Sequence, residues 1–212
     1  MNIDEKFNLN VEKLKQSPVF AMSLGSKELF HSNFWAYLIE QKETRELIKC
    51  FFPDFDIELY DRVGREDNNR DLTIYDKNGN EYVIENKIKS YPRQEQLEGY
   101  EKGNFTSGVI TGINEPPFKL QNWRFVSYHM ISESLKQINS EISGYYKDLI
   151  NDYCDVLDSI NELLNLSMKE TEGRLSYWSE NINKLYEFYK VFVRNFYWYA
   201  YICYAFALGW TE

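Results

Sequence analysis

Residues 70–88 read RDLTIYDKNGNEYVIENKI, two β-rich runs on either side of a turn. The Asn-Gly pair at 78–79, between such runs, is a strong signal for a β-hairpin. Side chains alternate faces along a strand, so Glu85 and Lys87 point to one face and Asn86 points to the other. The hairpin therefore carries a carboxylate and an ammonium group on one face of the same strand.

The length of the hairpin loop decides which residues face each other. A three-residue loop over 77–79, a type I turn closed by a left-handed glycine, sets Asp71 opposite Glu85 with their Cβ atoms about 5 Å apart. A two-residue Asn-Gly loop would shift the register by one residue and set Asp71 opposite Asn86. If the two carboxylates act together, we expect the three-residue loop or a nearby β-bulge.

Two carboxylates that face each other repel, so a proton, a cationic side chain or a metal ion must offset their charge. Lys87 is the nearest cationic candidate, and a bound Mg²⁺ is the second. A solvated hairpin face with an incidental Glu/Lys pair would explain the same residues. The apolar neighbours Val83, Ile84 and Ile88 favour a central strand and weigh against that alternative.

Composition limits the classes of protein to which the chain could belong. Its 212 residues are enough for one sizeable core, and its net charge is −9. Such an acidic chain is not expected to coat nucleic acid, because backbone affinity comes largely from Lys and Arg. Neither a disulfide framework nor a cysteine- or histidine-rich metal site is expected from the few, widely spaced residues available, Cys50, Cys154, Cys203, His31 and His129.

The two ends of the chain indicate its compartment and its contacts. The polar start at residues 1–6 shows no signal peptide, which favours the reduced cytoplasm. The uncharged run 196–210 is too short for a comfortable membrane span and contains several tyrosines. We expect no membrane segment, but an aromatic helix that is buried or that contacts a partner or a second copy of the chain.

The periodicity of apolar residues predicts an α/β fold, a mixed central β-sheet flanked by helices with a helical C-terminal extension. The division falls between a core over 1–131 and an extension over 132–212, whose second helical run spans 173–207. The expected elements are a helix over 26–50 capped by Ser23 or Ser26, a helix over 93–102, and strands over 56–63, 70–75, 82–88, 105–113 and 124–131.

This order of elements resembles the PD-(D/E)XK nuclease superfamily. The motifs that carry the resemblance are Arg70-Asp71 and Glu85-Asn86-Lys87, with 13 residues between the aspartate and the glutamate. The helix over 96–100 is similar to the Gln-x-x-x-Tyr helix of the exonuclease-like branch. Arg70 stands where the family usually has a proline. The resemblance covers about residues 23–131 and implies a restriction-endonuclease-like core.

The resemblance also implies roles for individual residues. Mg²⁺ or Mn²⁺ would be held by oxygen atoms, which Mg²⁺ prefers, from Asp71, Glu85, Glu28 and the carbonyl group of Asn86. Lys87 would orient or activate the attacking water, and the metal would lower the pKa of that water. Gln96 and Tyr100, which share a helix face at i and i+4, would shape the site. The implied catalytic set is Asp71, Glu85, Lys87, Glu28, Gln96 and Tyr100.

Each of these residues also has a plainer interpretation. Glu28 could simply favour a helix N-terminus electrostatically, and Gln96 with Tyr100 could be an ordinary surface pair. His31 could approach the site or belong to the core. Arg65 could contact a phosphate or form an ion pair within its loop.

The expected function is a metal-dependent nuclease, an endonuclease or an exonuclease, that hydrolyses phosphodiester bonds in DNA. The first alternative is an inactive nuclease-like module that binds nucleic acid or a protein partner, which the acidic charge and the aromatic tail favour. The joint presence of Asp71, Glu85 and Lys87 weighs against it. The second alternative is a helical interaction protein in which the C-terminal helices do the binding.

Overall fold

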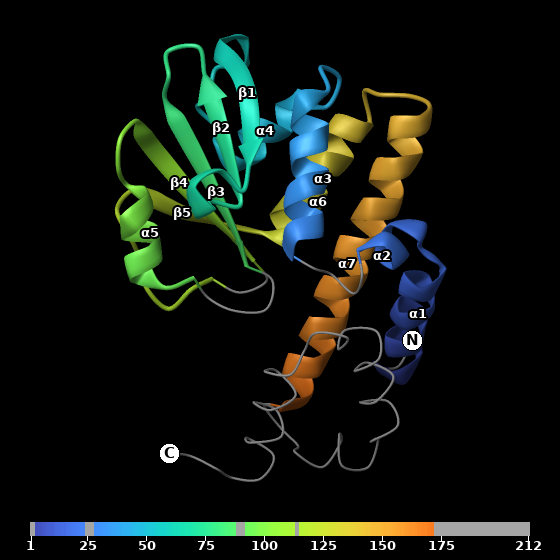
Figure 1. Cartoon of the computed structure of the whole chain (residues 1–212). Helices are drawn as coiled ribbons and strands as arrows, with labels where there is room; N and C mark the ends of the chain where they lie inside the picture. The colour runs from blue at the N-terminus through green and yellow to red at the C-terminus, as the bar shows by residue number, and fades with distance from the viewer. Residues whose placement is uncertain (1–2, 24–27, 88–91, 113–114, 172–212) are drawn as a thin grey trace, which may run out of the picture. The chain divides into compact units, whose positions relative to one another are not determined.

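The computed structural model describes residues 3–23, 28–87, 92–112 and 115–171 (Figure 1). The chain forms two compact units, Lys27–Cys154 and the combination of Met1–Ser26 with Asp155–Glu212. The helical run expected over 173–207 and the aromatic helix expected over 196–210 lie outside the described residues.

The unit Lys27–Cys154 is built on a five-stranded mixed sheet with the strand order β1-β2-β3-β4-β5. Neighbouring strands are antiparallel from β1 to β3 and parallel from β3 to β5. The α/β fold with a mixed central sheet is therefore confirmed. The strands are β1 (Tyr60–Arg65), β2 (Leu72–Asp76), β3 (Glu81–Lys87), β4 (Phe105–Gly112) and β5 (Trp123–Ser127).

The β2–β3 hairpin closes with the three-residue loop that the sequence predicts. The Gly79 N–H donates to the Asp76 carbonyl at 3.0 Å, and the Asp76 N–H donates to the Asn80 carbonyl at 3.2 Å. Gly79 has a φ of +84°, a conformation that a glycine adopts without a Cβ clash. The Asp76 carboxylate also accepts the Asn78 and Asn80 N–H groups, which fixes this turn.

The register follows from the turn. Leu72 pairs with Ile84 across β2 and β3, so one further step along both strands sets Asp71 opposite Glu85. The third strand is the central one in the sheet order, as its apolar residues predict. The position of Glu85 on that strand explains why its side chain is only 1% exposed.

Helices pack on both faces of the sheet (Figure 1). The helix α5 (Gln94–Tyr100) covers the face that carries Glu85, above a core cluster of Val83, Leu97, Tyr100, Ile110 and Trp123. Helices α3 (Glu28–Glu40) and α6 (Tyr128–Asn139) lie on the face that carries Asn86. The functional strand thus has different neighbours on its two sides.

The helix predicted over 26–50 is divided. After α3 the chain turns, and it continues as the 3₁₀ helix η1 (Arg45–Leu47) and the short α4 (Ile48–Phe51). Thr44 Oγ1 donates to the Leu38 carbonyl at 2.5 Å, and Arg45 Nε donates to the Ile39 carbonyl at 3.1 Å. These side chains donate hydrogen bonds to carbonyl groups at the end of α3 and so stabilise the end of the helix there. The periodicity of apolar residues does not reveal where this helix ends.

The cap expected for that helix stays a prediction, because residues 24–27 lie outside the described part of the chain. Ser23, one of the two candidate caps, lies directly after α2 (Pro18–Met22), where its Oγ donates to the Phe20 carbonyl at 2.7 Å. Ser26, the other candidate cap, lies outside the described residues.

Two predicted strands differ from the structure at one end. The strand expected over 56–63 begins only at Tyr60, after the 3₁₀ helix η2 (Ile57–Leu59). The strand expected over 124–131 ends at Ser127, whose Oγ accepts the Met130 N–H at 3.2 Å and caps α6. The predicted boundary between residues 131 and 132 therefore falls inside α6, and the division into core and extension stays a prediction.

The other unit contains α1 (Ile3–Gln16), α2 and the part of α7 (Tyr145–Thr171) from Asp155 onward. Phe7, Val11 and Leu14 recur at helical spacing and are buried, which makes α1 an amphipathic helix. An ion pair joins Lys6 and Glu162 at 3.6 Å. None of the described helices combines the length and the apolar character that a membrane crossing needs.

Candidate active site

The expected carboxylates and lysine converge where β2 begins and β3 ends. Lys87 Nζ lies 2.9 Å from Oε1 of the buried Glu85. The Asn86 N–H donates to Oδ2 of the half-buried Asp71 at 2.7 Å, which ties the two strands together at the site. The hairpin thus brings two acidic groups and one ammonium group to one end of the strand pair.

Burial and mutual repulsion dominate the electrostatics of this group. Burial, and then the charge of Asp71, raise the pKa of Glu85 to about 7, although Lys87 and Gln96 act in the opposite direction. Burial also raises the pKa of Asp71 above its usual value, against the Asn86 N–H and Lys87. Burial lowers the pKa of Lys87, but Glu85 and Asp71 raise it more. The two carboxylates are therefore short of positive charge.

The helix α5 delivers two further polar groups. Gln96 Nε2 donates to Glu85 Oε1 at 2.8 Å and to the Tyr100 hydroxyl at 2.6 Å. The Tyr100 hydroxyl in turn donates to the Asn69 carbonyl at 2.5 Å. These two side chains therefore do not form an ordinary surface pair, because Gln96 contacts the carboxylate of the central strand.

The side chain of Asn86 organises the opposite face of β3. It is fully buried, and its Nδ2 donates to the Glu28 carbonyl at 2.8 Å and to Ser32 Oγ at 3.2 Å. Its Oδ1 accepts the hydroxyl groups of Thr111 at 2.8 Å and of Tyr128 at 2.6 Å. All four hydrogen-bonding positions of the amide are used. This one residue links β3 to α3, β4 and α6.

Glu28 is the first residue of α3 and is held beside the site by its own carbonyl group. Because Asn86 binds that carbonyl, the start of α3 lies next to the end of β3. The charge of Glu28 contributes to raising the pKa values of Asp71 and Lys87, so it lies within electrostatic range of both. A favourable charge at a helix N-terminus and a contribution to the site are both consistent with this position.

The carboxylate of Glu85 has one satisfied and one unsatisfied oxygen. Oε1 accepts from both Lys87 and Gln96, whereas the buried Oε2 has no hydrogen-bond partner within the described part of the chain. A buried carboxylate oxygen without a partner is destabilising, and a hard divalent cation would satisfy it. The oxygen donors of Glu85, Asp71, Glu28 and the Asn86 carbonyl fit Mg²⁺ or Mn²⁺.

The other candidates from the sequence lie elsewhere. His31 is fully buried, and its Nδ1 is hydrogen-bonded to the Tyr153 hydroxyl at 2.7 Å, so it is a core residue. Arg65 Nη1 donates to Asn33 Oδ1 at 3.0 Å in an exposed position and forms no loop ion pair among the described residues. Neither residue takes part in the hydrogen bonds around Glu85.

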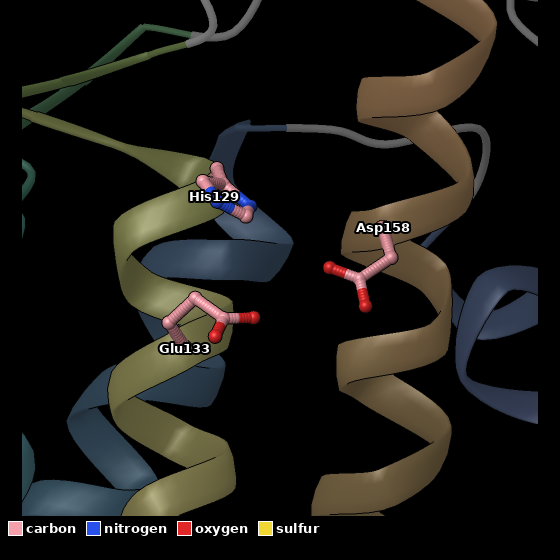
Figure 2. Close-up of side chains that lie close together, drawn as sticks. All are labelled: His129, Glu133 and Asp158. Carbon is pink, nitrogen blue, oxygen red and sulfur yellow. The ribbon is translucent and has the colours of Figure 1, made fainter.

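A second group of potential metal ligands lies partly on α6. Figure 2 shows His129 and Glu133 one helical turn apart on that helix, and it also labels Asp158, which lies on α7 in the other unit. His129 and Glu133 are exposed, and Glu133 is already in an ion pair with Lys136 at 2.7 Å. Within its own unit, α6 offers only these two ligands, which does not make a metal site.

Sequence reasoning noted Arg70 only as a departure from the family motif. The structure buries it, with Nη1 donating to Glu81 Oε2 and Nη2 donating to the Tyr100 carbonyl at 2.7 Å. An arginine directly before Asp71, in place of the proline, was the available signal. The contribution of the Asn86 side chain was missed because a polar residue pointing away from the site gives no local signal.

Comparison with known families agrees with this arrangement. Residues 19–107 match the family model of the PD-(D/E)XK nuclease superfamily, a segment that contains Asp71, Glu85, Lys87 and the helix α5. Neither a curated protein nor a solved structure matches the chain.

Proposed function

We propose that this chain, whose residues 19–107 match the family model of the PD-(D/E)XK nuclease superfamily, is a nuclease that uses a divalent cation to hydrolyse phosphodiester bonds in DNA. The observation that carries the proposal is the buried Glu85 Oε2 without a partner, beside Lys87 and opposite Asp71. A site with no chemical task would have no need for two opposed acidic groups at one end of a strand pair.

The cation would be Mg²⁺ or Mn²⁺, held by Asp71, Glu85, the Asn86 carbonyl and Glu28. When bound, it would polarise the phosphate and lower the pKa of the attacking water. Gln96 occupies Oε1 of Glu85 and thereby leaves Oε2 as the oxygen for the cation. The Asn86 N–H holds Oδ2 of Asp71, which leaves Oδ1 for the same purpose.

Lys87 supplies the positive charge that the phosphate needs. Its Nζ is 2.9 Å from Glu85, and neighbouring carboxylates raise its pKa, so it remains an ammonium group at neutral pH. It would therefore donate hydrogen bonds to the attacking water or to a phosphate oxygen, and it would not act as the base. A compact ammonium group suits this role because it imposes no bidentate geometry.

The Gln-x-x-x-Tyr helix supports placement in the exonuclease-like branch of the superfamily. In this chain, Gln96 touches Glu85 and Tyr100 touches Gln96, so both belong to the immediate surroundings of the carboxylates. Gln96 would fix the carboxylate, and the Tyr100 hydroxyl would fix Gln96. Cleavage from the ends of linear DNA is the corresponding expectation.

The alternative function is an inactive nuclease-like module that binds nucleic acid or a protein. The net charge of −9 favours the form of this module that binds a protein, since an acidic chain attracts polyanions weakly. The convergence of Asp71, Glu85, Lys87 and Gln96 favours the enzyme.

The test is a cleavage assay on linear DNA, circular DNA and RNA with Mg²⁺, with Mn²⁺ and with chelator. Asp71→Asn and Lys87→Met are expected to reduce metal-dependent cleavage of DNA at least about a hundredfold. Lys136→Met is the matched control, because Lys136 is an exposed lysine that is paired with Glu133 on α6. The nuclease proposal is rejected if no nucleic acid is cleaved and calorimetry detects no binding of Mn²⁺.

A further inference from the structure

Arg70 is a buried arginine whose guanidinium group joins two parts of the fold. Its side chain is 6% exposed and pairs with Glu81 at the start of β3. Its Nη2 donates to the backbone carbonyl of Tyr100, the last residue of α5, at 2.7 Å. Arg70 thus connects the segment directly before Asp71 with the end of the helix that carries Gln96.

The neighbouring residue makes a second connection to the same tyrosine. The Asn69 carbonyl accepts the Tyr100 hydroxyl at 2.5 Å, so residues 69 and 70 hold both the side chain and the backbone of Tyr100. Asn69 has a φ of +62°, a left-handed conformation that asparagine adopts more readily than most residues. The turn before β2 therefore has a specific shape where it meets α5.

The helix α5 needs such an anchor. It has seven residues, and helices of this length are not stable on their own, so contacts with the rest of the fold must hold it. The last carbonyl groups of a helix also lack intrahelical partners, and Arg70 supplies one to Tyr100. From Tyr100 the contacts continue through its hydroxyl to Gln96, and from Gln96 to Glu85.

We propose that Arg70 is a positioning residue that clamps α5 to the start of β2, so that Gln96 holds Oε1 of Glu85 and leaves Oε2 directed to the cation. The arginine touches neither Glu85 nor Asp71 through any hydrogen bond among the described residues, so it acts through Tyr100 and Gln96. The clamp itself is a feature of the metal-free fold, and only its effect on the cation depends on the proposed function.

The variant must remove the clamp without leaving a buried charge. Arg70→Met alone would leave the carboxylate of Glu81 without its cationic partner. The double variant Arg70→Met/Glu81→Met therefore replaces the ion pair with two apolar side chains. Arg70→Lys is the second variant, which keeps a charge for Glu81 but has no planar fork to reach Tyr100 as well. Arg62→Met is the matched control, an exposed arginine stacked on the Tyr75 ring at 3.8 Å.

The first measurement needs no metal. The side-chain amide signals of Gln96 are followed by ¹H–¹⁵N NMR and assigned by their absence in Gln96→Ala. In the wild type and in Arg62→Met we expect shifted signals, because Nε2 donates to both Glu85 and Tyr100. In the double variant and in Arg70→Lys they should move to the position of a free amide. Unchanged signals in folded variants would overturn the clamp.

The second measurement is Mn²⁺ affinity by calorimetry. Loss of a group that orients a metal ligand typically weakens binding 10- to 100-fold, so we expect at least about a tenfold higher Kd for the clamp variants. If Arg70 acts through Gln96, adding Gln96→Ala to Arg70→Lys should cause little further weakening. Losses that multiply, or an unchanged Kd in the clamp variants, would overturn the positioning role while the nuclease proposal stands. Moved Gln96 signals in a protein whose wild type binds no Mn²⁺ would overturn the nuclease proposal while the clamp stands.

Discussion

Gln96 Nε2 lies 2.8 Å from Glu85 Oε1, so a side chain from a short helix orients the carboxylate at the centre of the sheet. The same oxygen receives the Lys87 ammonium group at 2.9 Å. With Oε1 occupied twice, the carboxylate presents its other oxygen, which has no partner among the described residues. The orientation of a single carboxylate thus depends on two neighbouring elements.

Removing Gln96 should weaken cation binding with little effect on the fold. In Gln96→Ala, Oε1 keeps only the Lys87 contact and Glu85 can rotate, so we expect an increase of about tenfold or more in the Kd for Mn²⁺ by calorimetry. Gln94→Ala is the control, since Gln94 lies on the same helix and is exposed, with a hydrogen bond to Glu98. Equal affinities in the two variants would contradict this role for Gln96.

Changing Asn86 to aspartate should destabilise the protein more than removing the Thr111 hydroxyl that donates to it. The new carboxylate cannot donate to the Glu28 carbonyl, and it adds a buried negative charge near Asp71. We expect a loss of about 2–4 kcal/mol in the free energy of unfolding in urea at pH 8. Thr111→Val, which removes one hydroxyl donor to Asn86, should lose about 1 kcal/mol. Comparable stability of N86D and wild type would argue against the central role of the amide.

The metal-free protein should lose stability as the pH rises. The pKa of Glu85 is about 7 in the folded protein and 4.5 ordinarily, so the folded state binds more protons between these values. Because the raised pKa belongs to an acid, stability falls from about pH 4.5 to pH 7 and then levels off, and the raised pKa of Asp71 acts in the same direction. The raised pKa of Lys87 acts only at strongly alkaline pH and does not affect this window.

Glu85→Gln should remove most of this pH dependence. Between pH 4.5 and pH 8, the free energy of unfolding of the metal-free wild type should fall by about 1–3 kcal/mol more than that of the variant. Urea unfolding at each pH measures both values. Mg²⁺ should stabilise the wild type at pH 8 but not the variant. Parallel profiles of unfolding free energy against pH for the two proteins would show that the pKa of Glu85 is not raised by its burial.

Two glycines near the site should respond in opposite ways to alanine. A Cβ on Gly108 would lie 2.3 Å from the ring of Trp123, so Gly108→Ala should destabilise the protein by about 1–3 kcal/mol. A Cβ on Gly99, inside α5, would meet no described atom within 4 Å. Gly99→Ala should therefore raise Tm, with a gain of up to about 1 kcal/mol from helix propensity. Thermal unfolding compares the two, and a similar loss in both would refute the packing argument.

Some features of the site were predictable from the sequence because they depend on neighbours in the chain. The Asn-Gly pair predicts the hairpin, and the three-residue loop, one of its two possible loops, sets Asp71 opposite Glu85. The i, i+4 spacing of Gln96 and Tyr100 likewise places both on one face of α5. The strand predicted over 124–131 was too long, because the apolar residues on both sides of Ser127 suit a strand as well as a helix. The hydroxyl group of Ser127 caps α6 and ends the strand there.

Only the tertiary structure decided which distant groups meet at the site. Asn86 binds groups on α3, β4 and α6, and Arg70 binds a carbonyl thirty residues further along the chain. No local pattern encodes these contacts, because the partners are far apart in the chain. They meet only when the parallel strands have paired and the helices have packed on the sheet. The sequence by itself therefore determined that two carboxylates and a lysine share one strand pair. The packing of helices on both faces of the sheet decided how Glu85 is oriented and how deeply it is buried.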